Sequence, residues 1–360
     1  MAWLMIFVNS PESVCDFCEI FAADVAEASE EDKFIAVDTE FIRENLSIPL
    51  MCLVQVATAR TVFVIDPLAV DLAFLKPVLE DEKLPKVFHA GQQDVEILGI
   101  HNLAVKNICD TQLYEMLLST HDRISYQDIV KKYLDKNINK SYSTSNWMNR
   151  PLNKKQLLYS AEDVLYLRSV HKKQQELLRR CGRCHWLDGE IASFYKKDKT
   201  PKTKESNLFQ QLFGWRAAKA AEIGMDAQSI AHDTLLNKIC KKGTPLIRTV
   251  QNSRWIINDT RREFLQFAEQ LTKNMKISKD IRPKNISVYL LKAILEIKSA
   301  ESSVAASIIA TTGELEKLCN GYSDVKCLRG WRNEIFGQYA QSFLRGELTI
   351  AMKNSNVILK

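Results

Sequence analysis

The sequence predicts an α/β core, in which a mixed β-sheet is flanked by helices, followed by two all-α helical domains. In the first part, short runs rich in β-branched residues alternate with segments of helical apolar spacing, whereas only helical spacing is found after residue 205. A charged stretch separates the two parts. We therefore expect a core over 1–195, a charged linker over 196–205, and helical domains over 206–284 and 285–360.

The elements of the core are predicted in chain order. Residues 1–8 predict a first strand, after which Ser10 suits a helix cap and Pro11 the first helical turn. In that helix Cys15 and Cys18 share the pattern of the apolar residues, so we expect both thiols in the core. Further strands are predicted over 34–41, 50–57, 61–66, 86–90 and 105–109, and further helices over 72–79 and after Gly91 and Asp110.

The two helical domains repeat each other weakly. Ser229-Ile-Ala, followed by Leu235 and Cys240, returns as Ser307-Ile-Ile-Ala, followed by Leu315 and Cys319, at an offset of 78–79 residues. Two related helical modules explain this repeat, and coincidence among leucine-rich helices is the alternative.

Composition and charge narrow the classes of function. The chain is 46% hydrophobic and 26% charged, as ordinary globular proteins are. No apolar run approaches the ~20 residues of a membrane span and no export signal is found, so we expect a cytoplasmic protein without a membrane partner. Residues 1–100 carry 6 Lys/Arg and 18 Asp/Glu, whereas residues 101–360 carry 43 and 26. An acidic front and a basic remainder fit metal-binding carboxylates beside a phosphate-binding surface, although a solvated charged surface gives the same counts.

Two carboxylates end the strand over 34–41. Asp38 and Glu40 are two residues apart, so their side chains point to the same face of the strand. On a largely apolar strand they repel each other and are poorly hydrated, and a hard cation with oxygen ligands relieves both effects. From this pair alone, exposed acids at a strand end are an equally good interpretation.

Two further acids have a similar setting. Asp94 lies in the first turn of a predicted helix, where an ordinary helix-start acid is the alternative. Tyr159 and Asp163 are four residues apart on one helix face. A phenol beside a metal-bound carboxylate can position or deprotonate a water, although a core tyrosine with a hydrated hydroxyl is common. We expect Asp66 in a turn and Asp110 as a helix cap.

Taken in this order, these segments resemble the DEDD superfamily of 3′–5′ exonucleases, in its DEDDy branch, and specifically the ribonuclease D family. Asp38-Thr-Glu40-Phe matches the first motif, the run from His89 to Asp94 the second, and Tyr159 with Asp163 the third. The similarity extends to segments between the motifs. These are Leu50-Met-Cys-Leu-Val-Gln55, Ile65-Asp-Pro-Leu68, Asp110-Thr-Gln112 and Trp147-Met-Asn-Arg-Pro-Leu152.

The helical domains resemble the helicase-and-RNase-D C-terminal (HRDC) domain. Leu212-Phe-Gly-Trp-Arg216 fits that pattern in the first copy. The second copy fits more loosely, because Ile297-Lys298 replaces the Trp-Arg pair.

The resemblance implies an RNase H-like exonuclease core followed by two HRDC-like domains, and tRNA maturation as the usual task. It implies that Asp38, Glu40, Asp94 and Asp163 bind two divalent metal ions, Mg²⁺ or Mn²⁺, and that Tyr159 orients the attacking water. The expected partner is RNA, especially tRNA precursors with 3′ trailers, trimmed to 5′-mononucleotides, and no obligate protein partner is implied. Glu162 stands where small residues are common in the family and adds an acid beside the site.

Candidate RNA contacts are basic and aromatic residues near the third motif and in the first helical domain. They could follow the RNA backbone, stack on a base, or hold a folded RNA through its phosphates. The candidates are Lys140, Trp147, Arg150, Lys154, Arg216 and Lys219. For each one, a solvated basic group or a packed aromatic ring is the alternative.

Two other functions stay open at this point. One is a DNA 3′–5′ exonuclease, because the same core serves both substrates, and the other is a non-catalytic RNA-binding protein. Ribonuclease D-like segments between the motifs and HRDC-like domains favour RNA. The complete carboxylate set argues against a loss of catalysis.

Overall fold

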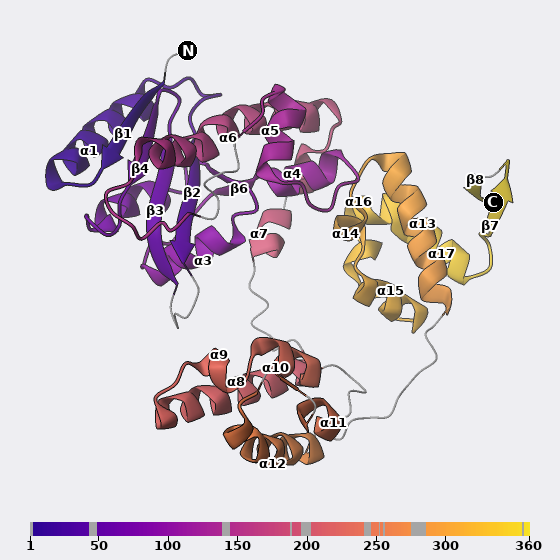
Figure 1. Cartoon of the computed structure of the whole chain (residues 1–360). Helices are drawn as coiled ribbons and strands as arrows, with labels where there is room; N and C mark the ends of the chain where they lie inside the picture. Colours follow the sequence, from indigo (N-terminus) through magenta and orange to yellow (C-terminus); the bar gives the residue numbers. More distant parts are fainter. Residues whose placement is uncertain are drawn as a thin grey trace. The chain divides into compact units, whose positions relative to one another are not determined.

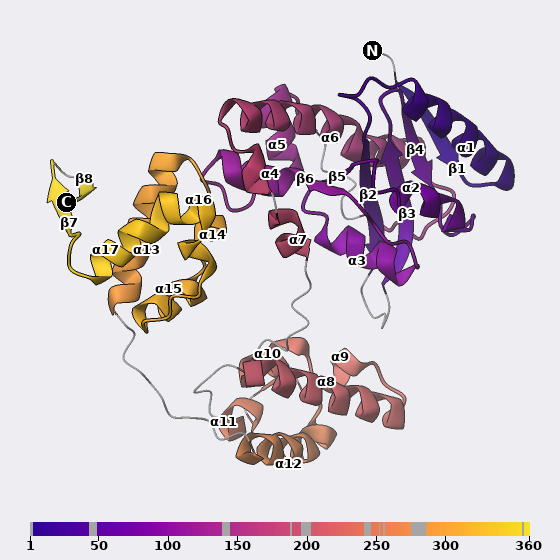
Figure 2. The same ribbon diagram turned by 180° about the vertical axis from the view of Figure 1, so that it is seen from behind.

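The computed structural model (Figures 1 and 2) describes residues 3–42, 49–138, 145–187, 189–195, 203–240, 246–251, 253–254, 256–274, 286–354 and 356–360. The chain forms two compact units. One combines Met1–Tyr195 with Lys284–Lys360, and the other is Lys196–Pro283. Among the described residues, no helix combines the length and the apolar character that crossing a membrane requires.

Six strands form the mixed sheet of the first unit. They are β1 (Leu4–Val8), β2 (Ile35–Ile42), β3 (Leu50–Ala57), β4 (Thr61–Ile65), β5 (Lys86–Phe88) and β6 (Ile108–Asp110). Their order across the sheet is β1-β4-β3-β2-β5-β6, in which β3 is antiparallel to β2 and β4 and the other neighbours are parallel. The predicted mixed sheet is confirmed, although β6 begins three residues later than expected.

Side chains of the strands alternate between apolar layers on the two faces of the sheet. Val37 belongs to the layer that packs against α1 (Pro11–Ala26), η1 (Leu72–Leu75), α2 (Lys76–Leu79) and α3 (Gln92–Ile100). Ala36 belongs to the opposite layer, which packs against α6 (Lys154–Arg180), the long helix that crosses the sheet in Figure 1. Because the period is two residues, Asp38 and Glu40 share the face of Ala36 and lie on the side of α6.

Helix α1 begins as predicted. Ser10 and Ser13 form a capping box, and Pro11 is the first helical residue. The expectation that Cys15 and Cys18 pack in the core was wrong, since both thiols are exposed. The buried stripe of α1 runs through Phe17 and Phe21, and the two cysteines lie off that stripe.

Further helices complete the first unit. In the N-terminal part these are α4 (Thr111–Leu118), α5 (Tyr126–Leu134), η2 (Cys184–Leu187) and α7 (Glu190–Tyr195). Residues 285–360, called the C-terminal module below, contain α13 (Ile286–Ser302), α14 (Ala306–Ile309), α15 (Thr312–Cys319), η3 (Lys326–Leu328), α16 (Gly330–Arg332), η4 (Asn333–Gly337) and α17 (Gln338–Leu344).

The C-terminal module shares its apolar core with the N-terminal part of the unit. Leu117 of α4 and Ile309 of α14 are both fully buried in one cluster of apolar side chains. The indole rings of Trp186 and Trp331 stack across the same contact, with ring centroids 4.6 Å apart. The sequence separates residues 285–360 from the core, but in the structure they complete it.

The expectation that this module is wholly helical was wrong at its end. The chain closes with an antiparallel hairpin of β7 (Ile350–Lys353) and β8 (Asn356–Leu359). Asn354, in the turn, has a φ of 49°, a left-handed conformation that asparagine tolerates better than most residues.

The second unit consists of α8 (Thr203–Ile223), α9 (Ala227–Ile230), α10 (Asp233–Cys240), α11 (Leu246–Gln251) and α12 (Asn258–Asn274). It has an apolar cluster of its own, which includes Leu212 and Phe264. Helices α9 and α10 recur 79 residues later as α14 and α15, with the same lengths. Helix α8 begins at Thr203, within the stretch predicted as a linker, and residues 196–202 lie outside the described residues.

Truncation after Tyr195 should prevent stable folding, although residues 1–195 contain the whole sheet. Leu113, Tyr114, Met116 and Leu117 of α4 would lose the C-terminal module that covers them. At about 1.5–3 kcal/mol each, their exposure costs about 6–12 kcal/mol, which equals the stability of a typical domain. We expect the full chain, but not fragment 1–195, to melt cooperatively when followed by circular dichroism. A fragment with the melting temperature of the full chain would contradict the shared core.

Candidate active site

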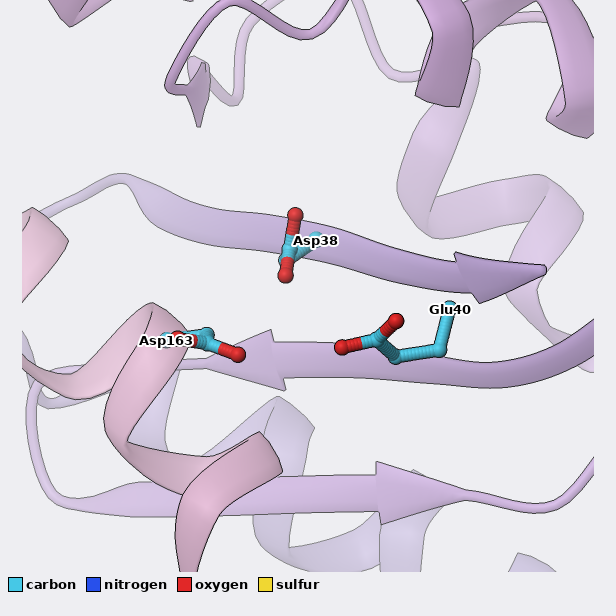
Figure 3. A group of neighbouring side chains, drawn as sticks. All are labelled: Asp38, Glu40 and Asp163. Carbon is cyan, nitrogen blue, oxygen red and sulfur yellow. The ribbon is translucent and has the colours of Figure 1, made fainter. Parts of the chain in front are cut away.

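Three carboxylates meet between β2 and α6. Asp38 and Glu40 come from the strand and Asp163 from the helix. One oxygen atom of each side chain lies within 4.8 Å of the other two. Figure 3 shows the carboxylates of Glu40 and Asp163 pointing toward each other, with Asp38 beside them. The structure thus brings together three of the four predicted metal ligands.

Local structure fixes where these side chains lie. Strand β2 is paired on both sides, by β3 and β5, and a register shift between Glu40 and Phe41 interrupts its regular pairing with β3. Helix α6 begins with a capping box of Asn153 and Gln156, which sets the phase of the helix that carries Asp163.

Tyr159 lies one helical turn before Asp163 on α6. Its ring is 7% exposed, and its hydroxyl donates a hydrogen bond to the Asp163 carboxylate. Loss of hydration and the surrounding carboxylates raise the pKa of Tyr159 above its ordinary value. The phenol is therefore protonated at neutral pH.

Asp94, the fourth predicted ligand, lies in the first turn of α3 and is 9% exposed. The hydroxyl of Thr39, the residue between Asp38 and Glu40, donates to its carboxylate. The turn before α3 needs a glycine, because a Cβ at Gly91 would lie 2.5 Å from Phe88. Loss of hydration raises the pKa of Asp94 to about 6, although the bond from Thr39 opposes this shift.

The cluster carries more negative charge than its surroundings can hydrate. Loss of hydration, followed by repulsion from Asp163 and Asp94, raises the pKa of Glu40 to about 9. Loss of hydration and repulsion also raise the pKa of Asp163 to about 8 and that of Asp38 well above its ordinary value. A divalent cation would supply the positive charge that replaces the lost hydration and cancels the repulsion, and oxygen donors alone select a hard ion.

A buried amide beside the cluster also fits a bound ion or ordered water. Gln55 of β3 lies directly opposite Asp38 in the sheet and is fully buried. In the part of the chain that the structure describes, neither atom of its amide has a hydrogen-bond partner. Unpaired polar groups in a protein interior commonly mark a missing water or ion.

The prediction missed several residues that support the site. Thr39 stands between two predicted ligands, yet the sequence gives no sign that its hydroxyl reaches Asp94. Tyr126 donates to the carbonyl oxygen of Glu162 at 2.8 Å, next to Asp163 on α6. Asp110 caps α4 as predicted, by accepting from the backbone N–H of Gln112, but it also binds the turn before α3.

Two of the predicted RNA contacts near the third motif serve the fold instead. Trp147 is 2% exposed and packs near Tyr159, so its ring offers no face to a base. Arg150 forms a bidentate ion pair with Asp66, with N–O distances of 2.5 and 2.7 Å, and also donates to the Cys52 carbonyl. Asp66 is in a turn as expected, since it accepts from the backbone N–H of Leu68.

The predicted contacts in the second unit are also engaged within the protein. Arg216 is 2% exposed and donates to Asp233 at 2.5 Å, so its guanidinium cannot reach a phosphate. Lys219 forms ion pairs with Glu222 and Glu263 at 2.9 and 2.8 Å. The sequence could not show this, because burial and pairing of a basic side chain depend on the fold.

Two of the six predicted RNA contacts have not yet been placed. Lys154 is exposed at the first residue of α6. Lys140 lies outside the described residues.

Comparison with known proteins identifies the family. Residues 16–179 match a family model described as a 3′–5′ exonuclease. A ribonuclease D of Bartonella henselae is 31% identical over 91% of this chain and 89% of its own length. A ribonuclease D of Sphingobium indicum is 31% identical over 97% of each chain. The chain belongs to the ribonuclease D family.

The fold agrees with this assignment. The crystal structure of Escherichia coli RNase D matches with a TM-score of 0.69 over 96% of this chain and 99% of that one, at 21% identity. As a member of the ribonuclease D family, the chain is a 3′–5′ exoribonuclease of the DEDD superfamily and hence a hydrolase. The predicted family and activity are confirmed, and the DNA exonuclease alternative is not favoured.

The metal-free protein should lose stability as the pH rises. When folded, Glu40 and Asp163 keep their protons up to about pH 9 and about pH 8, whereas the unfolded chain releases them near pH 4. The stability that the protonated carboxyls contribute is therefore complete below about pH 4 and is lost as the pH rises to about 9. We expect the melting temperature in EDTA to fall between about pH 6 and about pH 9, and excess Mg²⁺ to restore it.

Asp163→Asn tests the origin of this effect. The substitution removes one of the repelling charges. The melting temperature in EDTA should therefore fall less as the pH rises, and Mg²⁺ should raise it less. Asp16→Asn, which neutralises an exposed acid on α1, is the matched control and should behave as the unmodified protein does. An equal fall in both variants would show that the pH dependence arises elsewhere.

Proposed function

We propose that this enzyme removes nucleotides one at a time from the 3′ ends of structured RNAs, with tRNA precursors that carry 3′ trailers as principal substrates, and releases 5′-mononucleotides. The cluster of Asp38, Glu40 and Asp163 carries this proposal, because three carboxylates within 4.8 Å of one another can hold the metal ions that assist phosphodiester hydrolysis. The E. coli RNase D whose fold the chain shares is described as an exoribonuclease involved in structured RNA processing.

In this proposal Asp38, Glu40, Asp94 and Asp163 hold two divalent ions, Mg²⁺ or Mn²⁺. Bound ions would lower the pKa of a water and stabilise charge on the leaving 3′ oxygen. Asp94 lies outside the group of three, but its charge raises the pKa of both Asp38 and Glu40, which supports a common site.

The side chains of the protein orient the reaction. Water attacks the last phosphorus, the bond from this phosphorus to the 3′ oxygen of the preceding nucleotide breaks, and the terminal nucleotide leaves with the phosphate. Tyr159 stays protonated and donates a hydrogen bond to Asp163, so the oxygen of its hydroxyl can accept a hydrogen bond from the attacking water. Lys154, exposed at the positive end of α6, is a candidate contact for the RNA backbone.

A 5′-labelled tRNA precursor with a 3′ trailer should shorten in single-nucleotide steps toward the mature end when incubated with Mg²⁺ and resolved on a denaturing gel. EDTA and Asp38→Ala should each lower the rate by more than about 100-fold, because removing even an outer partner of a metal ligand costs up to that factor. Asp16→Ala, at an exposed position of α1, should leave the rate unchanged.

A DNA strand of the same sequence tests the substrate class in the same assay. It should be degraded more slowly than the RNA. Faster cleavage of DNA would overturn RNA as the substrate, and an intact precursor would overturn the proposed activity.

A further inference from the structure

Asp110 is a fully buried carboxylate on which four hydrogen bonds converge. The backbone N–H groups of Ala90 and Gly91 donate to its two oxygens at 3.0 and 3.1 Å, and that of Gln112 donates at 2.8 Å. The fourth donor is the hydroxyl of Tyr195, at 2.6 Å. Ala90 has a φ of 56°, which is unfavourable for a residue with a Cβ, so these bonds hold a turn that the chain does not favour by itself.

The last two residues of helix α7 contact the residues on either side of this turn. Tyr195, its last residue, reaches Asp110. Next to it, the carbonyl oxygen of Phe194 accepts from the side-chain amide of Gln92. Gln92 is the first residue of α3, and Asp94 follows two residues later. The end of α7 therefore contacts both Asp110, which holds the turn, and the start of α3, the helix that carries Asp94.

The other end of α7 is held by the C-terminal module. Glu190, the first residue of α7, is 6% exposed and accepts from both terminal nitrogens of Arg332, at 2.5 and 2.7 Å. Lys326 donates to the same carboxylate at 2.8 Å. Arg332 is itself buried and donates through Nε to the carbonyl oxygen of Ile308. Removing one partner of a buried ion pair is strongly destabilising, so the module fixes where α7 begins.

We propose that α7 is a clamp through which the C-terminal module fixes the position of Asp94, and that Tyr195 is the positioning residue at the end of this clamp. Tyr195 acts through Asp110 and the Ala90–Gly91 turn rather than on the substrate. The inference rests on the proposed function in one respect, namely that Asp94 is a metal ligand.

Hydrogen–deuterium exchange of the full-length protein tests the clamp without reference to activity. Tyr195→Phe removes the hydroxyl and keeps the ring, so exchange over residues 88–95 should become at least about fivefold faster while β2 is unaffected. Tyr322→Phe, at a side chain that is 63% exposed, is the matched control and should exchange as the unmodified protein does. Unchanged exchange over 88–95 in Tyr195→Phe would overturn the clamp.

Glu190→Gln tests the link to the C-terminal module in the same measurement. It weakens the ion pair at the far end of α7, and exchange over 88–95 should again become faster. Faster exchange that is confined to α7 itself would overturn the link to the module.

The metal dependence of RNA trimming tests the consequence for catalysis. In Tyr195→Phe the Mn²⁺ concentration that gives the half-maximal rate should rise by up to about 10-fold, the lower end of the range for groups that hydrogen-bond a metal ligand directly, while KM for the RNA stays constant. An unchanged Mn²⁺ dependence would overturn the positioning role of Tyr195. If the unmodified enzyme trims no RNA, the proposed function fails, and the exchange measurement still decides the clamp.

Discussion

Crowding of carboxylates at one poorly hydrated point is the constraint on which this structure depends. Like charges this close repel each other, and a flexible site would relax by moving them apart. The acids are instead carried by elements that cannot yield easily: Asp38 and Glu40 by a strand paired on both sides, and Asp163 by the 27-residue helix α6. The apolar layers on both faces of the sheet supply the free energy that offsets this local cost.

Much of the core could be predicted because its signals are local. The alternation that puts Asp38 and Glu40 on one face is a property of any strand, and the four-residue spacing of Tyr159 and Asp163 is a property of any helix. The mixed sheet also follows from short β-branched runs separated by turn residues. For these features, the spacing of residues in the sequence is enough to predict which side chains lie on the same face of a strand or helix.

The features that sequence could not reveal depend on contacts between distant segments. Arg216 and Trp147 have side chains of the kinds that bind RNA, yet both are 2% exposed, because partners far along the chain or in another element cover them. The prediction that the cysteines of α1 are buried was wrong for a different reason. The spacing of apolar residues does not show where the edge of the buried stripe of a helix lies. The hydrogen bond from Tyr195 to Asp110 joins residues 85 positions apart, and the sequence around neither residue predicts it.

The discontinuity of the first unit has a consequence for synthesis on the ribosome. Asp163 completes the set of carboxylates that we propose as metal ligands, but Ala340, in the cluster that covers α4, is made far later. At about 5–20 residues per second, the delay is roughly 10–35 s. During this interval the nascent chain contains all four proposed metal ligands but lacks the C-terminal module that completes the apolar core of their unit. We therefore expect nuclease activity to arise only in the nearly finished protein. The incomplete chain would then leave intact the RNAs that take part in its own translation.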